Sequence, residues 1–267
     1  PPHHVYIGRN QMHDDRENAV DLKTIHDVVV SENEMFSYAS SATSGGDAIV
    51  VGSNGFDDAT NMGPRRIWIL HNDVRDAARG IRVEGSEDVW IIGNLFTSVS
   101  QGIQIDDKTH RDIIIASNTL SEVSEGLNIN GCQPSMLRFS NNIIVDATDR
   151  LIDLRECPAS ILNLESNLLW NSDGSFSVRA DGTNHDDLAS LEAQSFATGN
   201  LFGDPLFDGD GLIPSGSSPA IDAGASLESV YQHFQSTIGP VIAVDRARTP
   251  RPSGAAEDIG AFERPSL

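Results

Sequence analysis

The residues of this sequence that could bind or transform a ligand recur in pairs, two positions apart, inside short runs that are otherwise apolar. The runs read VDLK, IRVE, IQID, LNIN, IDLR and VRAD. Their polar members include Asp21, Lys23, Arg82, Glu84, Gln104, Asp106, Asn128, Asn130, Asp153, Arg155 and Arg179. This alternation is typical of a strand with one face in a core, so we expect each pair to point to the same side.

Carboxylates, amides and cationic groups in this mixture suit the binding of an acidic carbohydrate polymer. β-Elimination from a uronic acid requires neutralisation of its carboxylate and a base that removes the C5 proton. Lys23 and Arg82 are our candidates for these catalytic roles. Carboxylate oxygens also bind hard cations, and Asp21, Glu84 and Asp106 could together hold Ca²⁺.

The remaining polar residues are candidates for contacts with the substrate. They are Gln104, Asn128, Asn130, Asp153, Arg155, Arg179 and His13, the last of which precedes the run that contains Lys23. A second interpretation of Arg155 and Arg179 is that they form surface ion pairs with Asp153 or Glu156, which would contribute little to stability. The sequence leaves both interpretations open.

A repeated asparagine predicts how these runs are brought together. It follows a short β-branched run and precedes an apolar pair, at Asn10, Asn33, Asn72, Asn94, Asn118, Asn142, Asn167 and Asn200. Five of the seven spacings are 22 to 25 residues, and the other two are 39 and 33. A period of this length indicates one coil of a solenoid with three short strands. We therefore predict an all-β, right-handed parallel β-helix of about eight coils.

The asparagines themselves have a structural explanation. An asparagine tolerates left-handed backbone geometry at a sharp turn, and stacked amides can donate and accept along the axis as a ladder. The apolar–polar run of each coil precedes its asparagine by about 14 residues, as the printed sequence shows. Since a single coil cannot bury its hydrophobic side alone, stacking of neighbouring coils would build the core.

Aligning the runs on their apolar positions predicts two columns of outward residues. The first is Asp21, Val50, Arg82, Gln104, Asn128, Asp153 and Ser177. The second is Lys23, Gly52, Glu84, Asp106, Asn130, Arg155 and Arg179. Coils in a parallel stack are about 4.8 Å apart, so the columns would form a polar strip long enough for several sugar rings.

The two long spacings predict insertions. The first would lie around residues 53–64 and the second around residues 181–187, both rich in turn-forming residues. Insertions in a solenoid usually project from its side. Cys132 and Cys157 are 25 residues apart, one coil by the local period, so they should stack; a disulfide and a pair of buried thiols both fit.

The last part of the chain changes character and resembles the C-terminal tail common in secreted bacterial β-helix proteins. The matching elements are DPLF at residues 204–207, SPAIDAG at 218–224 and DIGAFE at 258–263. We therefore divide the chain into β-helix coils over residues 1–203 and an irregular cap over 204–267, with a short helix near residues 226–236. The chain starts in mid-repeat, so we expect further coils upstream or a partner over that end.

A shorter segment resembles the polysaccharide lyase group that contains alginate lyases and chondroitinase B. In that group an acidic residue and a lysine followed by a small hydroxyl residue lie on one coil, with an Arg-His-Gly motif on the next. Glu17 and Lys23-Thr24 match within residues 17–33, whereas the next coil reads DAIVVGSNG and lacks the second motif. The resemblance implies β-elimination on a uronate polymer. Polygalacturonase-type hydrolases are a further comparison: Asp106-Asp107 gives a carboxylate pair, but no Gly-His-Gly follows.

The composition of the chain limits the kinds of molecule that it can bind. The net charge is −21 over 267 residues, which disfavours nucleic acid and anionic membranes, and no apolar run is long enough to span a bilayer. We expect a secreted or cell-surface protein that acts on an acidic polysaccharide, with lyase-like chemistry. The alternatives are a non-catalytic glycan-binding or adhesive module and a β-helix glycoside hydrolase.

Overall fold

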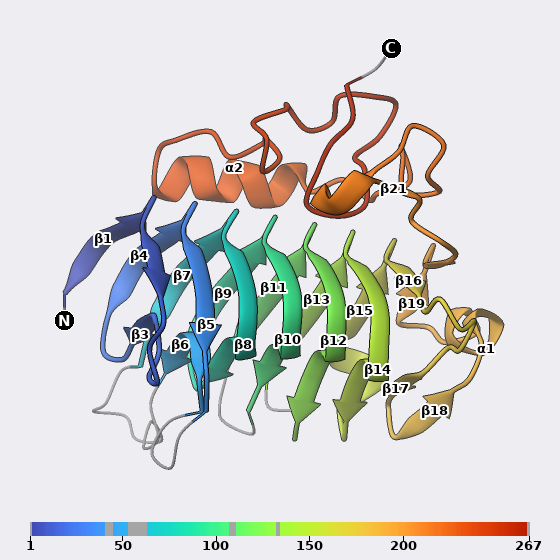
Figure 1. Cartoon of the computed structure of the whole chain (residues 1–267), viewed down its shortest axis with the longest axis horizontal. Helices are drawn as coiled ribbons and strands as arrows, with labels where there is room; N and C mark the ends of the chain where they lie inside the picture. The colour runs from blue at the N-terminus through green and yellow to red at the C-terminus, as the bar shows by residue number, and fades with distance from the viewer. Residues whose placement is uncertain (1, 41–44, 53–62, 107–110, 132–133, 266–267) are drawn as a thin grey trace.

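The chain winds into a right-handed parallel β-helix, which confirms the predicted fold (Figure 1). A computed structural model describes residues 2–40, 45–52, 63–106, 111–131 and 134–265. The first predicted insertion lies largely outside the described residues, as do Asp107 and Cys132. Within them, nearly all strand pairs are parallel, and neighbours along a sheet come from successive coils.

One flank of the solenoid is an eight-stranded parallel sheet. In order, its strands are β1 (His3–Gly8), β4 (His26–Ser31), β7 (Arg65–Leu70), β9 (Glu87–Ile92), β11 (Asp112–Ala116), β13 (Met136–Ser140), β15 (Leu162–Glu165) and β19 (Ala197–Thr198). Each of the predicted asparagines lies at the corner that follows one of these strands.

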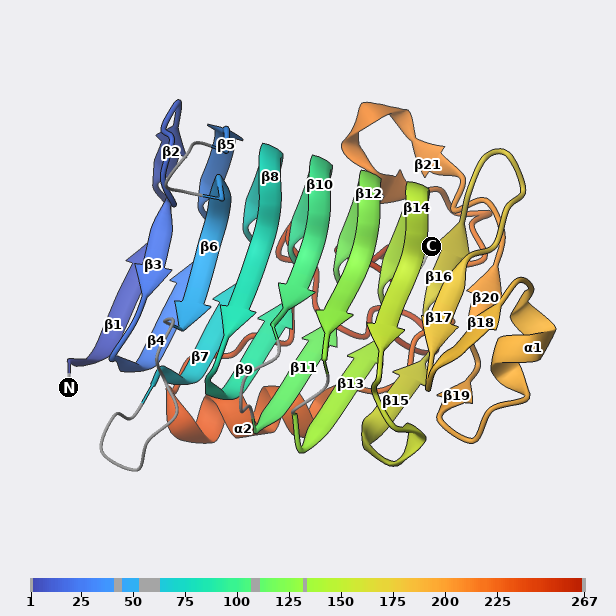
Figure 2. The same ribbon diagram turned by 90° about the horizontal axis from the view of Figure 1, so that it is seen from below.

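The second sheet has twelve strands and folds around two sides of the solenoid, which we call the first and second lanes. Four long strands run through both lanes, side by side in Figure 2: β8 (Asp73–Glu84), β10 (Leu95–Ile105), β12 (Thr119–Asn130) and β14 (Ile143–Arg155). The first lane also contains β2 (Gln11–His13), β5 (Glu34–Tyr38), β16 (Leu168–Trp170) and β20 (Leu201–Phe202). The second lane also contains β3 (Val20–Leu22), β6 (Asp47–Gly52), β17 (Val178–Ala180) and the antiparallel β18 (Thr183–His185).

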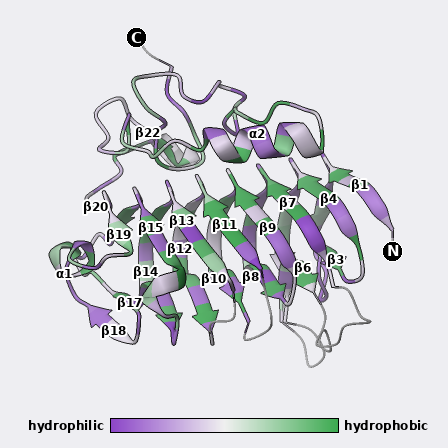
Figure 3. Ribbon diagram, turned by 180° about the vertical axis from the view of Figure 1, so that it is seen from behind, coloured by the Kyte–Doolittle hydropathy of each residue, from purple (hydrophilic) through white to green (hydrophobic). Residues whose placement is uncertain are grey.

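The long strands bend between the lanes at one residue each. Asp76, Ser98, Glu122 and Asp146 occupy this position, with φ between 51° and 56°. In the interior of the solenoid, side chains that are paired across neighbouring coils stack in rows along its axis. Ile81, Ile103, Leu127 and Ile152 form one such row and are almost fully buried. Figure 3 shows the resulting bands of hydrophobic and hydrophilic residues along the strands.

The predicted asparagine ladder is confirmed. Each side-chain amide donates to the Oδ1 atom of the asparagine on the next coil, at 2.9 to 3.0 Å, from Asn10 through to Asn200. The expectation that the asparagine takes the left-handed conformation is wrong. The residue before it does, at Arg9, Glu32, His71, Gly93, Ser117, Asn141, Ser166 and Gly199. The asparagine must instead aim its amide along the axis, while its backbone N–H also donates to the next amide oxygen.

The second insertion closes one end of the solenoid and does not project from its side as predicted. It forms the hairpin of β17 and β18 and the helix α1 (Leu188–Glu192), which lies at the end opposite the N-terminus (Figure 1). Leu191 and Phe196 are buried in the main core. Only β19 and β20 continue the stack at this end, and apolar residues of the insertion cover the core beside them.

The C-terminal tail turns back and covers the outside of the eight-stranded sheet (Figure 1). Its helix α2 (Glu228–Thr237) agrees with the predicted short helix. Phe234 packs edge-on against Trp68, whose ring stacks on Trp90 at 3.9 Å. The expected boundary after residue 203 falls between β20 and β21 (Phe207–Asp208). β22 (Ile213–Pro214) and the 3-10 turns η1 (Ala159–Ile161) and η2 (Gly209–Gly211) are the remaining elements.

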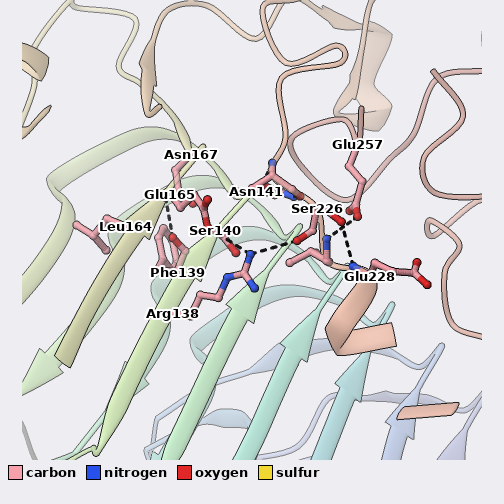
Figure 4. Close-up of polar contacts among 12 residues, drawn as sticks. Arg138, Phe139, Ser140, Asn141, Leu164, Glu165, Asn167, Ser226, Glu228 and Glu257 are labelled. Atoms are coloured by element: carbon pink, nitrogen blue, oxygen red, sulfur yellow. Dashed lines mark hydrogen bonds and ion pairs between the residues drawn. The ribbon is translucent and has the colours of Figure 1, made fainter. Parts of the chain in front are cut away.

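Polar contacts fix the tail to the solenoid (Figure 4). Arg138 on β13 forms an ion pair with Glu165 at 3.3 Å and donates to the carbonyl oxygen of Ser226 at 3.4 Å. Asn141 exchanges two hydrogen bonds with the backbone of Ala225, at 2.7 and 2.8 Å. The tail is therefore part of the same folded unit as the coils.

Candidate functional site

The outward side chains of the second lane form the predicted polar strip. The register pairs Asp21 with Val50, Val50 with Arg82, Arg82 with Gln104, Gln104 with Asn128, and Asn128 with Asp153. The second column follows the same order where the strands pair, with Gly52 opposite Glu84 and Asn130 opposite Arg155. Asp106 follows Ile105, the partner of Val83, and so lies beside Glu84.

The predicted columns are wrong at their last coil, where the alignment is shifted by two residues. Arg179 lies opposite Asp153 in the first column, and not opposite Arg155 in the second. The corner between β16 and β17 is longer than the corresponding corner of the previous coil, so the offset between the coils is 26 residues. Asn171 holds this corner by accepting from the N–H of Ala147 at 2.8 Å and donating to the carbonyl oxygen of Ser175 at 3.1 Å.

A third column, which the sequence analysis missed, borders the strip. It consists of Asp47, Arg79, Gln101, Glu125 and Arg150. These residues lie three positions before the first column, in the segments DAIV, RGIR, QGIQ, EGLN and RLID. In all of these segments except DAIV, a polar residue, two small or apolar residues and a second polar residue follow one another, and this repeat was the available signal. The strip therefore consists of three columns of side chains in the coils whose strands are paired here.

Arg82 binds carboxylates on three sides. Its Nε and Nη2 atoms reach one oxygen of Asp106 at 2.9 and 2.8 Å, Nη2 also contacts Glu84, and Nη1 is 3.8 Å from Asp47. Burial would lower the pKa of Arg82, but the bonds to Asp106 and the surrounding negative charge raise it. Burial also raises the pKa of Glu84, although Arg82 opposes this. Arg82 therefore stays protonated, and it can neutralise a ligand only by sharing these partners.

The neighbouring arginine extends the same network. Arg79 pairs with Asp47, whose side chain is almost fully buried, and donates to Oε1 of Gln104 at 3.3 Å. The amide of Gln104 donates in turn to Asp106. This chain of contacts holds four polar side chains in fixed positions across three coils. A prearranged row of donors and acceptors is suited to binding the hydroxyl and carboxylate groups of a polymer.

A second network lies at the other end of the strip. The buried carboxylate of Asp153 accepts from Nε and Nη2 of Arg179, both at 2.6 Å, and from Nε of Arg155 at 3.1 Å. Burial would raise the pKa of Asp153, but these bonds outweigh it and lower the pKa. Both arginines therefore form ion pairs with Asp153, but these are not the surface pairs of the sequence interpretation, because Asp153 is buried. Pairing with Asp153 does not exclude ligand contact, because the Arg155 side chain is 51% exposed.

The two asparagines lie between these networks. Asn128 is buried and donates to Glu125 at 2.7 Å, while its Oδ1 atom is buried with no hydrogen-bond partner among the described residues. Asn130 is half-buried on the outward face beside Arg155. The register places Asn128 between Gln104 and Asp153, and so between the two networks.

Lys23 and Asp21 lie at the N-terminal end of the strip. Their side chains form an ion pair at 3.1 Å, and the lysine side chain is 64% exposed. Lys23 is therefore accessible but lies two coils from Glu84, the second-column residue beside Arg82. His13 is not on the strip: it lies on β2 in the first lane, stacks on Phe36 at 4.6 Å and bonds Asp14 at 2.6 Å.

The predicted calcium ligands do not form one site. Asp21 is paired with Lys23, whereas Glu84 and Asp106 both contact the guanidinium group of Arg82. Across the described part of the chain, no group of three or more acidic, histidine or cysteine side chains is arranged to hold a metal ion. Because Asp21 is paired with Lys23, while Glu84 and Asp106 share the guanidinium group of Arg82, these three carboxylates do not fit one Ca²⁺ site.

The strip differs in charge from the rest of the protein. Its acidic residues include Asp21, Asp47, Glu84, Asp106, Glu125 and Asp153, and its basic residues include Lys23, Arg79, Arg82, Arg150, Arg155 and Arg179. These twelve side chains balance in charge, whereas the whole chain has a net charge of −21. An anionic polymer would meet less repulsion here than elsewhere on the molecule.

Comparison with known proteins agrees with this architecture. The family model described as the right-handed β-helix region matches residues 3–180. No curated protein matches the chain. Among the helices that the structure describes, none has the length and apolar character needed to cross a bilayer.

Proposed function

Because the chain belongs to the right-handed β-helix family, a fold that occurs in polysaccharide-active proteins, we propose that it binds an anionic, uronate-containing polysaccharide along the strip. The observation that carries the proposal is the register of the second lane. It places polar side chains on consecutive coils from Arg82 to Arg179. With coils about 4.8 Å apart, this row can contact several sugar units of one extended chain.

The chemistry of the strip favours an acidic polymer over a neutral one. A guanidinium group has five N–H donors in a planar fork that matches a carboxylate. Pairing with Asp153 uses Nε and Nη2 of Arg179, which leaves its other terminal nitrogen to bind a ligand. Buried carboxylates and amides hold the arginines in place, so little side-chain entropy is lost on binding.

Binding can be tested with purified protein and polymers of defined charge. We expect alginate, pectate or chondroitin to retard the protein in affinity electrophoresis, and neutral dextran to leave its mobility unchanged. The double variant Arg155→Gln/Arg179→Gln should lose the retardation. Arg75→Gln is the matched control, because Arg75 lies over Phe36 in the first lane. Equal retardation of wild type and the double variant would contradict the proposal.

Lyase-like elimination on the bound polymer is our second candidate function. The observation that favours it is the exposed ammonium group of Lys23 beside Asp21 at one end of the strip. In this proposal Lys23 first loses its proton to solvent, and its free amine then accepts the C5 proton. The C4–O glycosidic bond breaks as the C4=C5 double bond forms, the leaving oxygen takes a proton from water, and Arg82 binds the substrate carboxylate. The assay is the absorbance of the unsaturated product during incubation with each uronate polymer. Product formation that Lys23→Ala abolishes would support catalysis; binding without product, unchanged by Lys23→Ala, would support a non-catalytic glycan-binding module.

The cysteines bear on where the protein acts. Cys157 is buried and disulfide-bonded, while its predicted partner Cys132 lies outside the described residues. Disulfides persist mainly in oxidising compartments, so we propose that the protein acts outside the cytoplasm. Detection in the extracellular or envelope fraction of its source cells would support this proposal, and confinement to the cytoplasm would contradict it.

A further inference from the structure

An apolar cavity of about 450 Å³ lies at the N-terminal end of the solenoid, away from the strip. It opens between β1, β4 and the chain segment that follows α2. Val29, Leu70, Phe234 and Ile242 provide buried apolar groups in its lining. The volume falls within the range of small-molecule sites.

The cavity lies between the sheet and the part of the tail that follows α2. α2 packs over the outward apolar side chains of β7 and β9. After α2 the backbone turns at Gly239, where φ is 110°, and runs on through Val241. Tyr6 and Val241 remain 58% and 61% exposed, which makes them the most exposed large hydrophobic side chains in the described part of the chain. Both line this one cavity.

A cationic pair lies on the polar side of the cavity. Glu32 accepts from Nε of Arg9 at 2.8 Å and also contacts Arg248, so two guanidinium groups share one carboxylate. All three residues line the cavity. Asp27, the other acidic residue of the lining, is paired with Arg66, whose bond to it lowers the pKa of Asp27. With Arg66 counted, three guanidinium groups face two carboxylates, and this excess of one positive charge favours a ligand with one negative charge.

We propose that this cavity binds a small anionic amphiphile, such as a medium-chain carboxylate or an aromatic acid. The apolar body would fill the space between Tyr6 and Val241, and the anionic head would bind Arg9 and Arg248. Burial of the apolar body supplies the main driving force. Charge-assisted hydrogen bonds to the two guanidinium groups supply the selectivity for an anion.

The test uses the anionic dye 8-anilinonaphthalene-1-sulfonate and its displacement by dodecanoate at concentrations below micelle formation. We expect one dye molecule per chain, displaced by dodecanoate and about tenfold more weakly by dodecanol, since a charge-assisted bond contributes roughly that factor. More than one dye molecule per chain, or equal displacement by the acid and the alcohol, would overturn the proposal.

Two variants locate the binding site. Val241→Asp should abolish displaceable dye binding, because it places a negative charge in the apolar mouth. Arg248→Asn should weaken dodecanoate about tenfold; asparagine is chosen because Arg248 has a φ of 72°, which asparagine tolerates. Met136→Asp is the control, since Met136 is an exposed apolar residue on β13, remote from the cavity. Thermal unfolding should be the same for all three variants. An equal loss of binding in Met136→Asp, or unchanged binding in Val241→Asp, would exclude this cavity.

Discussion

The carboxylate of Glu192 takes the place of a further asparagine at the end of the ladder. It accepts from the side-chain amide of Asn200 at 2.7 Å and from the backbone N–H of Asn200 at 3.0 Å. Every earlier ladder asparagine makes these two bonds to the Oδ1 atom of the next coil. The second oxygen of Glu192 binds the N–H of Gly199 at 2.9 Å. A helix of the insertion thus completes the hydrogen bonding of the last coil.

Removal of this carboxylate should destabilise the end of the solenoid. Glu192→Ala leaves three N–H donors without their acceptor, and we expect a loss of about 2–3 kcal/mol in the free energy of unfolding. Glu192→Gln keeps one acceptor oxygen and should lose less. Urea denaturation followed by tryptophan fluorescence measures both. Asp186→Ala, at an exposed position of the same segment, is the control; an equal loss in that variant would contradict this role of Glu192.

A column of glycines allows the coils to approach closely beside the strip. A methyl group added at Gly102 would lie 2.6 Å from the carbonyl oxygen of Gly126 on the next coil. Gly102→Ala should therefore cost about 1–3 kcal/mol, because the backbone cannot give way without moving the adjacent strand. Gly216→Ala is the matched control, since nothing lies within 4 Å of the added carbon. A thermal melt that shows no difference between the two variants would contradict this explanation.

The sequence predicts the coil period, the ladder and the polar columns because each depends on a local pattern that repeats. It does not predict which neighbour a charged residue binds. Arg82 could bind within its own coil or across coils, and only the structure shows that it contacts Glu84 on its own strand and Asp106 on the next. The two-residue error at Arg179 has a similar origin, since corner length cannot be deduced from an alternating pattern.

The sequence pattern also did not predict that the C-terminal tail packs on the eight-stranded sheet. The runs RRIWIL and EDVWII place apolar residues on both faces of β7 and β9, which is typical of strands that are buried on both sides. The sequence did not indicate what covers the outer face. In the structure Trp68 and Trp90 point outward, and α2 covers them. Such runs in a solenoid predict that some segment lies over that flank.

Stability should depend on pH through His71. Burial, with the nearby charges of Arg251 and Arg246, lowers the pKa of His71 to about 4. The unfolded chain takes up a proton near pH 6.5, whereas the folded chain does so only near pH 4, so the fold loses stability as the pH falls between these values. The difference amounts to roughly 3 kcal/mol.

His71→Asn should remove this dependence and keep the left-handed backbone, since φ at His71 is 56°. The measurement is the free energy of unfolding in urea at pH 7 and pH 4.5 for both proteins. Burial raises the pKa of Glu257, Asp258 and Glu263, which favours the fold at the lower pH in both. The comparison between the proteins therefore isolates His71. Parallel pH profiles would show that His71 has no such effect.

The two arginines bound to Asp153 should differ in their contribution to stability. The Arg179 side chain is 25% exposed and makes two bonds at 2.6 Å, whereas that of Arg155 is 51% exposed and makes one at 3.1 Å. Asp153 itself is fully buried. Arg179→Gln leaves a buried carboxylate with one partner, and we expect a loss of about 3 kcal/mol. Arg155→Gln removes the half-exposed partner with the longer bond, while Arg179 still binds both oxygens of Asp153, so the loss should be less than about 1 kcal/mol.

The same pair of variants separates stability from ligand binding. Bonds from Arg179 and Arg155 lower the pKa of Asp153 despite its burial, so its stabilising effect is fully present above about pH 4 and is lost as the pH falls through the lowered pKa of the folded state. The difference between wild type and Arg179→Gln should therefore be largest at pH 7 and should shrink as the solution is acidified below about pH 4. Retardation by alginate at pH 7 should fall in both variants, including the stable Arg155→Gln protein. If Arg155→Gln bound alginate as wild type does, the exposed arginine would have no role in the strip.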